Sequence, residues 1–113
     1  MVKVDFRTNH MPATDAMRAH VERRARAALR RHPDAVVRAT LRVRDINGPR
    51  GGNDIQCSLL IEGPRFGRLI GQVTHDDFYA GTTEVIRKVA HALDLDIRRR
   101  RRLFGGRDLP GEV

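Results

Sequence analysis

The sequence predicts an α+β domain with the order β-α-β-β-β-α, in which a four-stranded sheet has two helices packed on one face. Three short segments alternate apolar and polar residues, as strands with one buried face do, and a turn after the third leads into a fourth strand. Two longer segments repeat apolar residues every three or four positions, as on one face of a helix. Because 113 residues suit one core, we expect a single domain over residues 1–102 and a flexible C-terminal tail over 103–113.

The N-terminal third is predicted to form a strand and a helix. Val2, Val4 and Phe6 alternate with charged residues, which indicates a strand that is followed by a loop over residues 8–13. Thr14 is placed to cap a helix that extends to about His32, before Pro33. The inner face of this helix is predicted to carry Met17, Val21, Ala25, Ala28 and Leu29, and the outer face is predicted to carry Arg23, Arg26 and Arg30.

Three strands joined by hairpins should follow. The first spans residues 36–45 and turns one set of side chains inward, namely Val37, Ala39, Leu41 and Val43. Residues 46–53, rich in Gly and Asn, are predicted to connect it to a strand over 54–62. Gly63 and Pro64 then form a turn into a strand over 66–74. Cys57 alternates with Ile, Leu and Ile and is therefore expected to be a small buried thiol.

The last helix is predicted over residues 76–102, with Asp76 or Asp77 as its cap. Its apolar face is expected to consist of Phe78, Thr82, Val85, Ile86, Val89, Leu93 and Ile97. The helix runs into five consecutive arginines at its C-terminal end, where cations are favoured. Five arginines exceed what a helix end needs, because their mutual repulsion opposes the small gain at each. An anionic partner explains them.

The charge balance also indicates a nucleic-acid partner. The chain has 22 Lys and Arg against 14 Asp and Glu, a formal net charge of +8, and arginine has a planar fork that matches phosphate oxygens. The basic residues gather at the last helix end, on the polar face of strand 36–45 and on the first helix, where Glu22 alone accompanies Arg23, Arg24, Arg26, Arg30 and Arg31. With 4% aromatic residues and no groove-reading motif, backbone and shape recognition of folded RNA is favoured.

Other chemistries have little support in the sequence. The chain shows no phosphate-binding glycine loop, nucleophile elbow or metal-ligand spacing, and its five histidines are scattered, so we predict no catalytic residue, no metal and no cofactor. The sequence has neither a signal-peptide core nor a membrane span, which predicts a cytoplasmic protein without a membrane partner. The arginine run by itself is also compatible with a nuclear-localisation or polybasic membrane signal, but neither explains the first helix.

Three short motifs resemble one known family. Asn9-His10 follows the first strand, Thr14-Asp15-Ala16-Met17-Arg18 begins the first helix with Val21 after it, and Asp77-Phe78-Tyr79-Ala80 begins the second. In this order and with a basic helix end, they resemble the ribosome hibernation promoting factor and ribosome-associated inhibitor A family, also called the sigma-54 modulation protein family. The resemblance covers residues 2–102. The chain departs from the family pattern at Gly81-Thr82-Thr83, and Asp94 and Asp96 interrupt its cationic face.

The resemblance implies a translation inhibitor that binds the small ribosomal subunit between head and body, where mRNA and the A- and P-site tRNAs lie. It implies no small-molecule substrate, a monomer off the ribosome, and a short form without a dimerisation domain. The rRNA-binding role would fall to Arg18, Arg23, Arg26, Arg30, Arg87, Lys88, Arg98, Arg99, Arg100, Arg101 and Arg102. A regulatory module that binds a transcription factor or another protein is the alternative. An RNA-processing enzyme would need a catalytic constellation that the sequence does not offer.

Overall fold

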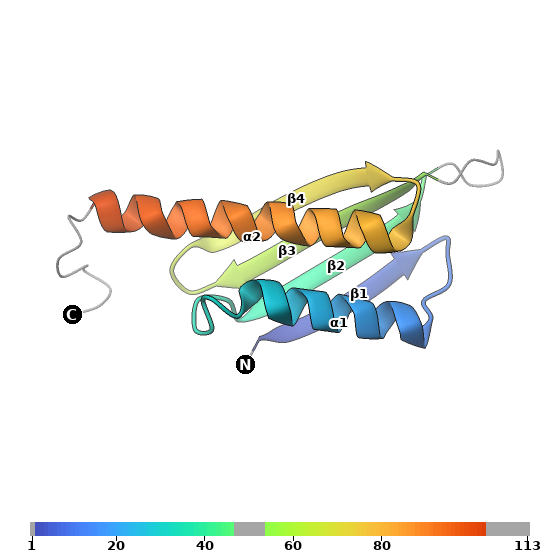
Figure 1. Cartoon of the computed structure of the whole chain (residues 1–113), viewed down its shortest axis with the longest axis horizontal. Helices are drawn as coiled ribbons and strands as arrows, with labels where there is room; N and C mark the ends of the chain where they lie inside the picture. The colour runs from blue at the N-terminus through green and yellow to red at the C-terminus, as the bar shows by residue number, and fades with distance from the viewer. Residues whose placement is uncertain (1, 47–53, 104–113) are drawn as a thin grey trace.

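The computed structural model describes residues 2–46 and 54–103, and it contains the predicted elements in the predicted order (Figure 1). The strands are β1 (Lys3–Asn9), β2 (Arg38–Asp45), β3 (Ile55–Gly63) and β4 (Gly67–His75), and the helices are α1 (Asp15–Leu29) and α2 (Phe78–Leu103). The predicted β2–β3 connection after residue 46 and the tail after residue 103 lie outside the described residues.

The sheet has the strand order β1-β2-β3-β4. β1 and β2 are parallel and are joined through α1, whereas β2, β3 and β4 form an antiparallel meander. Both helices cover the same face of the sheet and run in the same direction, so their C-terminal ends lie at the same end of the domain (Figure 1). The predicted α+β fold is confirmed.

The hydrophobic core lies between the two helices and the covered face of the sheet. The predicted helix faces are confirmed, with Met17, Ala28 and Ile97 half-buried beside the core. Cys57 is fully buried, and burial raises the pKa of its thiol to about 11. The core residues of the sheet are Phe6, Ala39, Leu41, Val43, Ile55, Cys57, Leu59 and Ile61.

Two glycines allow α2 to pack closely on the sheet. A Cβ atom at Gly71 in β4 would lie 2.6 Å from Val89 Cγ2 of α2. A Cβ atom at Gly81 would lie 3.1 Å from Cys57 Sγ and 3.0 Å from His75 Cβ. Glycine within a helix costs about 1 kcal/mol relative to alanine. At residue 81 this cost accompanies a close approach between α2 and β3.

The helix caps agree with the sequence. Thr14 Oγ1 accepts a hydrogen bond of 3.1 Å from Met17 N, which fixes the start of α1. Of the two candidate caps of α2, Asp77 fills the role, because its Oδ2 accepts a hydrogen bond of 2.8 Å from Ala80 N.

Two predicted details of the first half were wrong. α1 ends at Leu29 rather than near His32, because the His32 N–H bonds to Leu29 O at 3.1 Å in a tight turn before Pro33, which disfavours helical backbone in the residue before it. Val37 is 58% exposed, whereas Val36 is buried. The regular alternation begins only at Arg38, after this turn, so Val37 does not continue the inward row of β2.

Candidate nucleic-acid interface

The facing flanks of α1 and α2 form a shallow groove on the outer side of the domain. Arg24 enters it from α1, Arg31 enters it from the turn that follows α1, and Arg87 enters it from α2. Its remaining lining is mainly small or polar, namely Ala27, Ala28, Thr83, Ile86, Ala90, His91 and Asp94. Because small side chains separate the helices here, the arginines border an open groove instead of a packed seam.

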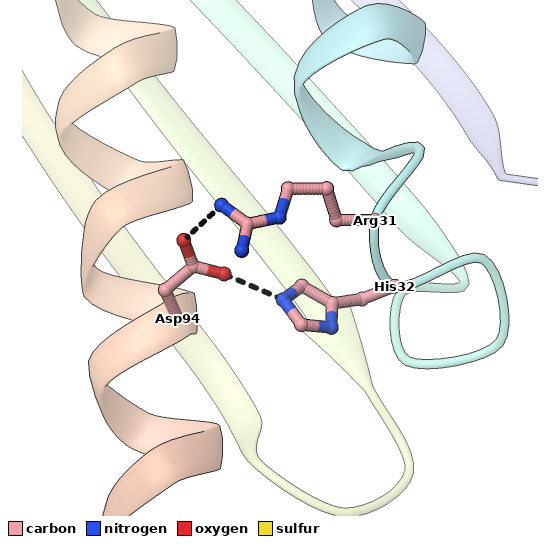
Figure 2. Close-up of polar contacts among 3 residues, drawn as sticks. All are labelled: Arg31, His32 and Asp94. Atoms are coloured by element: carbon pink, nitrogen blue, oxygen red, sulfur yellow. Dashed lines mark hydrogen bonds and ion pairs between the residues drawn. The ribbon is translucent and has the colours of Figure 1, made fainter.

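Asp94 is part of the lining of this groove and points toward Arg31 and His32 (Figure 2). Its Oδ1 lies 2.5 Å from His32 Nε2, and its Oδ2 accepts a hydrogen bond of 3.2 Å from Arg31 Nη1. The hydrogen bond with His32, followed by the charge of Arg31, holds the pKa of Asp94 below its ordinary value. The carboxylate therefore joins the residues that follow α1 to the middle of α2.

The acidic interruption predicted at Asp94 thus neutralises one arginine of the groove. Arg24 and Arg87 form no ion pair or hydrogen bond with any side chain in the described part of the protein. Both side chains belong to exposed residues. Two unneutralised guanidinium groups therefore face each other across the groove.

The predicted residues of α1 occupy different surroundings. Arg23 and Arg30 are exposed on the solvent side, as expected. The Arg18 guanidinium carbon lies 5.6 Å from the centre of the Phe6 ring, a cation–π contact at the start of the helix. The expectation that Arg26 lies on the outer face was wrong, because it is half-buried and donates a hydrogen bond of 3.0 Å to Val2 O. Its position on the flank of α1 beside β1 explains this contact.

The predicted residues of α2 are also divided. Arg87 faces α1, whereas Lys88 lies on the opposite flank and donates a hydrogen bond of 3.2 Å to Gln72 O of β4. Arg100 Nε bonds to Asp96 Oδ2 at 2.8 Å, so this second acidic interruption is paired along the helix. The exposed cations of the helix end are Arg98, Arg99 and Arg101, and Arg102 is also within α2.

Sequence reasoning did not include Arg24 and Arg31 among the site residues. Arg24 lies one turn before Ala28 on the same flank of α1, and Arg31 follows in the turn after the helix. That flank meets α2, a fact that depends on how the helices dock on the sheet.

His20, which appeared isolated in the sequence, is a buried residue between the helices. Its ring packs edge-on against Tyr79 with 4.9 Å between centroids, and its Nε2 lies 3.4 Å from Thr83 Oγ1. Burial is the largest cause that lowers the pKa of His20, and Arg24 and Arg23 lower it further. The residue therefore supports the junction of the helices in its neutral form.

Within residues 2–46 and 54–103, His, Cys, Asp and Glu side chains form no cluster of three or more that could hold a metal ion. Neither α1 nor α2 is both long and apolar enough to cross a membrane.

Comparison with known proteins places this fold in a family. The N-terminal domain of Protein Y from Thermus thermophilus superposes with a TM-score of 0.67 at 15% identity, covering 81% of this chain and 94% of that one. A ribosomal subunit interface protein from Coxiella burnetii superposes with a TM-score of 0.71 at 12% identity, covering 86% and 99%. At such low identities, the two superpositions show a shared fold. No curated protein sequence matches the chain. The family described as Sigma 54 modulation protein / S30EA ribosomal protein matches residues 4–102, and the chain belongs to this family.

Proposed function

We propose that the protein is a ribosome-binding translation inhibitor of the hibernation-factor type. It docks its basic helices onto small-subunit rRNA and blocks the positions of mRNA and of the A- and P-site tRNAs. Family membership and the description of the Coxiella protein as a ribosomal subunit interface protein support ribosome binding. The observation that carries the rRNA contact is the groove that Arg24 and Arg87 line from the two helices, without an acidic partner for either among residues 2–46 and 54–103.

An RNA backbone laid over this groove presents phosphates to both helices. Each guanidinium group offers two parallel N–H donors to phosphate oxygens. The exposed Arg23 and Arg30 continue the cationic surface outward, and Arg98, Arg99 and Arg101 continue it toward the end of α2. Inhibition then follows from steric exclusion of tRNA and mRNA, so no bond is made or broken and no cofactor is required. The protein acts as a monomer in the cytoplasm.

The test is co-sedimentation with purified small subunits over a range of salt concentrations. Arg24→Ala with Arg87→Ala should lower the affinity at least tenfold and reduce the slope of log K against log salt by about two, because each phosphate contact contributes about one unit. Lys3→Ala with Arg68→Ala removes the same charge from exposed sheet positions and is the matched control. Translation inhibition should weaken in parallel with binding.

Two results would contradict this proposal. If the groove variant binds small subunits as the control does, the arginine groove is not the rRNA contact. Should the protein fail to sediment with subunits at low salt and instead retain a protein partner at high salt, the alternative of a regulatory protein-binding module is correct.

A further inference from the structure

We propose that the open face of the sheet carries a second RNA-backbone site, formed around Arg7, Arg42 and Arg44. This proposal deepens the proposed function, because it rests on that function in taking ribosomal RNA as the ligand. It assigns to the domain two RNA contacts on opposite faces. The sequence had indicated a basic face on strand 36–45, but the function proposed for the helices does not use it.

Strand register brings the three arginines together. Arg7 of β1 is paired with Arg42 of β2 across the parallel ladder. Arg44 follows two positions along β2, on the same face. Adjacent strands lie about 4.8 Å apart, and alternate residues of a strand about 6.6 Å apart. The three exposed arginines therefore form a compact group, and they line one depression together with Asn9, Gln56 and Ser58.

The open face divides into a neutralised end and a cationic end. The acidic residues at its open positions in the four strands are Asp5 and Glu62. Asp5 lies one open position before Arg7 and pairs with Arg38 at 3.6 Å, and Glu62 pairs with Arg68 at 3.9 Å at the end away from the depression. Among the described residues, neither Arg7 nor Arg42 has an ion pair or a hydrogen bond through its side chain. Their charges are thus available to a ligand.

Polar neighbours complete a surface suited to phosphate. Arg44 Nε donates a hydrogen bond of 3.0 Å to Gln56 Oε1, which orients the guanidinium group and leaves its terminal nitrogens to face outward. The Gln56 and Asn9 amides supply further donors, whereas the Ser58 hydroxyl donates to Gln72 Oε1 at 3.5 Å and can accept a hydrogen bond. These are the groups that contact phosphate and sugar in protein–nucleic acid complexes.

The same surface lacks the features that bind unpaired bases or protein partners. No aromatic residue stands at an open-face position of the four strands, so unpaired bases have no stacking platform there. Protein partners are typically anchored by aromatic residues, and no aromatic residue lines the depression. Arginines with amide donors therefore favour the backbone of a duplex RNA over an acidic protein.

The sheet site and the helix groove face opposite sides of the domain. The helices cover one face of the sheet (Figure 1). The alternation of β1 and β2 places Arg7, Arg42 and Arg44 on the other face, near the C-terminal ends of these strands. One RNA segment cannot reach both sites by lying flat on either face. The domain accordingly bridges two separate RNA segments, which fixes its orientation between them.

The experiment measures how many short RNA duplexes the full chain binds. Titration calorimetry with a duplex too short to wrap around the domain should give two duplexes per wild-type molecule. Arg7→Ala with Arg42→Ala should reduce this number to one, and Arg24→Ala with Arg87→Ala should remove the other. Lys3→Ala with Arg68→Ala should retain both. Arg44→Gln should weaken the sheet site without removing it, and thermal melts should show that all variants remain folded.

The results separate this inference from the function on which it rests. If Arg7→Ala with Arg42→Ala binds as the wild type does while the groove variant loses binding, the sheet site is wrong and the helix contact stands. One duplex per wild-type molecule would also overturn the inference. If polyglutamate displaces RNA from the sheet site as effectively as a second RNA does, the face binds acidic protein and the assignment to RNA is wrong.

Discussion

Asp94→Asn tests whether the contact between the turn after α1 and the middle of α2 holds the two helices together. The substitution keeps the shape of the side chain but removes the charge that His32 and Arg31 share (Figure 2). The contacts of Asp94 with His32 and with Arg31 contribute unequally to stability. The His32 side chain is 21% exposed, whereas that of Arg31 is 68% exposed.

The expected loss in free energy of unfolding follows from this difference in exposure. An exposed ion pair contributes about 0.2 to 1 kcal/mol, so the Arg31 contact is weak. A half-buried hydrogen bond to a charged group contributes about 1.5 kcal/mol, the low end of its range, because solvent still screens it. We therefore expect Asp94→Asn to lower the free energy of unfolding by about 1.5 to 2 kcal/mol at neutral pH. A domain of this size then loses about 6 to 15 °C in Tm.

The effect should depend on pH. Since the pKa of Asp94 is lowered in the folded state, the ionised carboxylate stabilises the fold above the unfolded pKa of about 3.9. That stabilisation is lost as the pH falls through the folded pKa. The difference between wild type and Asp94→Asn should therefore be constant above about pH 5 and shrink below about pH 4.

Asp96→Asn is the matched control. Asp96 lies on the same helix with a similarly covered side chain, but it pairs only with Arg100 one turn away. A pair at this spacing contributes about 0.3 to 0.5 kcal/mol. Urea unfolding followed by far-UV circular dichroism suits a chain without tryptophan. Equal losses in both variants, or a difference that persists at pH 3, would refute the role given to Asp94.

Three further changes test the packing. Gly71→Ala should destabilise the protein by about 1 to 3 kcal/mol, because its new methyl group meets a buried α2 side chain, and urea unfolding measures the loss. Cys57→Ser should cost about 1 to 3 kcal/mol by burying a hydroxyl, with unchanged affinity for small subunits in co-sedimentation; lost binding at unchanged stability would make the thiol functional. Arg26→Ala should cost about 1 kcal/mol through its hydrogen bond to Val2 O, whereas Arg23→Ala should leave Tm within a degree or two, and equal melts would contradict this distinction.

The fold was predictable because each element carries its own periodicity. The α2 stripe from Phe78 to Leu93 and the alternation in β3 depend only on which face is buried, and both are evident in the sequence. The errors occurred in the segment that connects α1 to β2. The turn that ends α1 at Leu29 and the exposure of Val37 depend on local backbone geometry between two regular elements.

The candidate site was predictable in composition but not in arrangement. Runs of arginine identify the helices as cationic, yet Arg24 and Arg87 become neighbours only when α1 and α2 dock side by side on the sheet. Similarly, Arg7 and Arg42 are distant in the sequence and meet through the parallel register of β1 and β2. Asp94 shows the converse, since its negative charge interrupts a basic stretch in the sequence but pairs with residues from another element in the fold.

α2 is longer than its packing on the sheet requires. Its 26 residues extend about 39 Å at 1.5 Å per residue, whereas the nine residues of β4 extend about 30 Å. Ile97 is the last α2 residue that packs against the core among the side chains described as far as Arg101, and the end of the helix extends past the sheet (Figure 1). Cations at a helix end stabilise it by less than about 1 kcal/mol each, and adjacent like charges oppose that gain. Folding therefore accounts for α2 as far as Ile97, and we assign the arginines beyond it to the ligand.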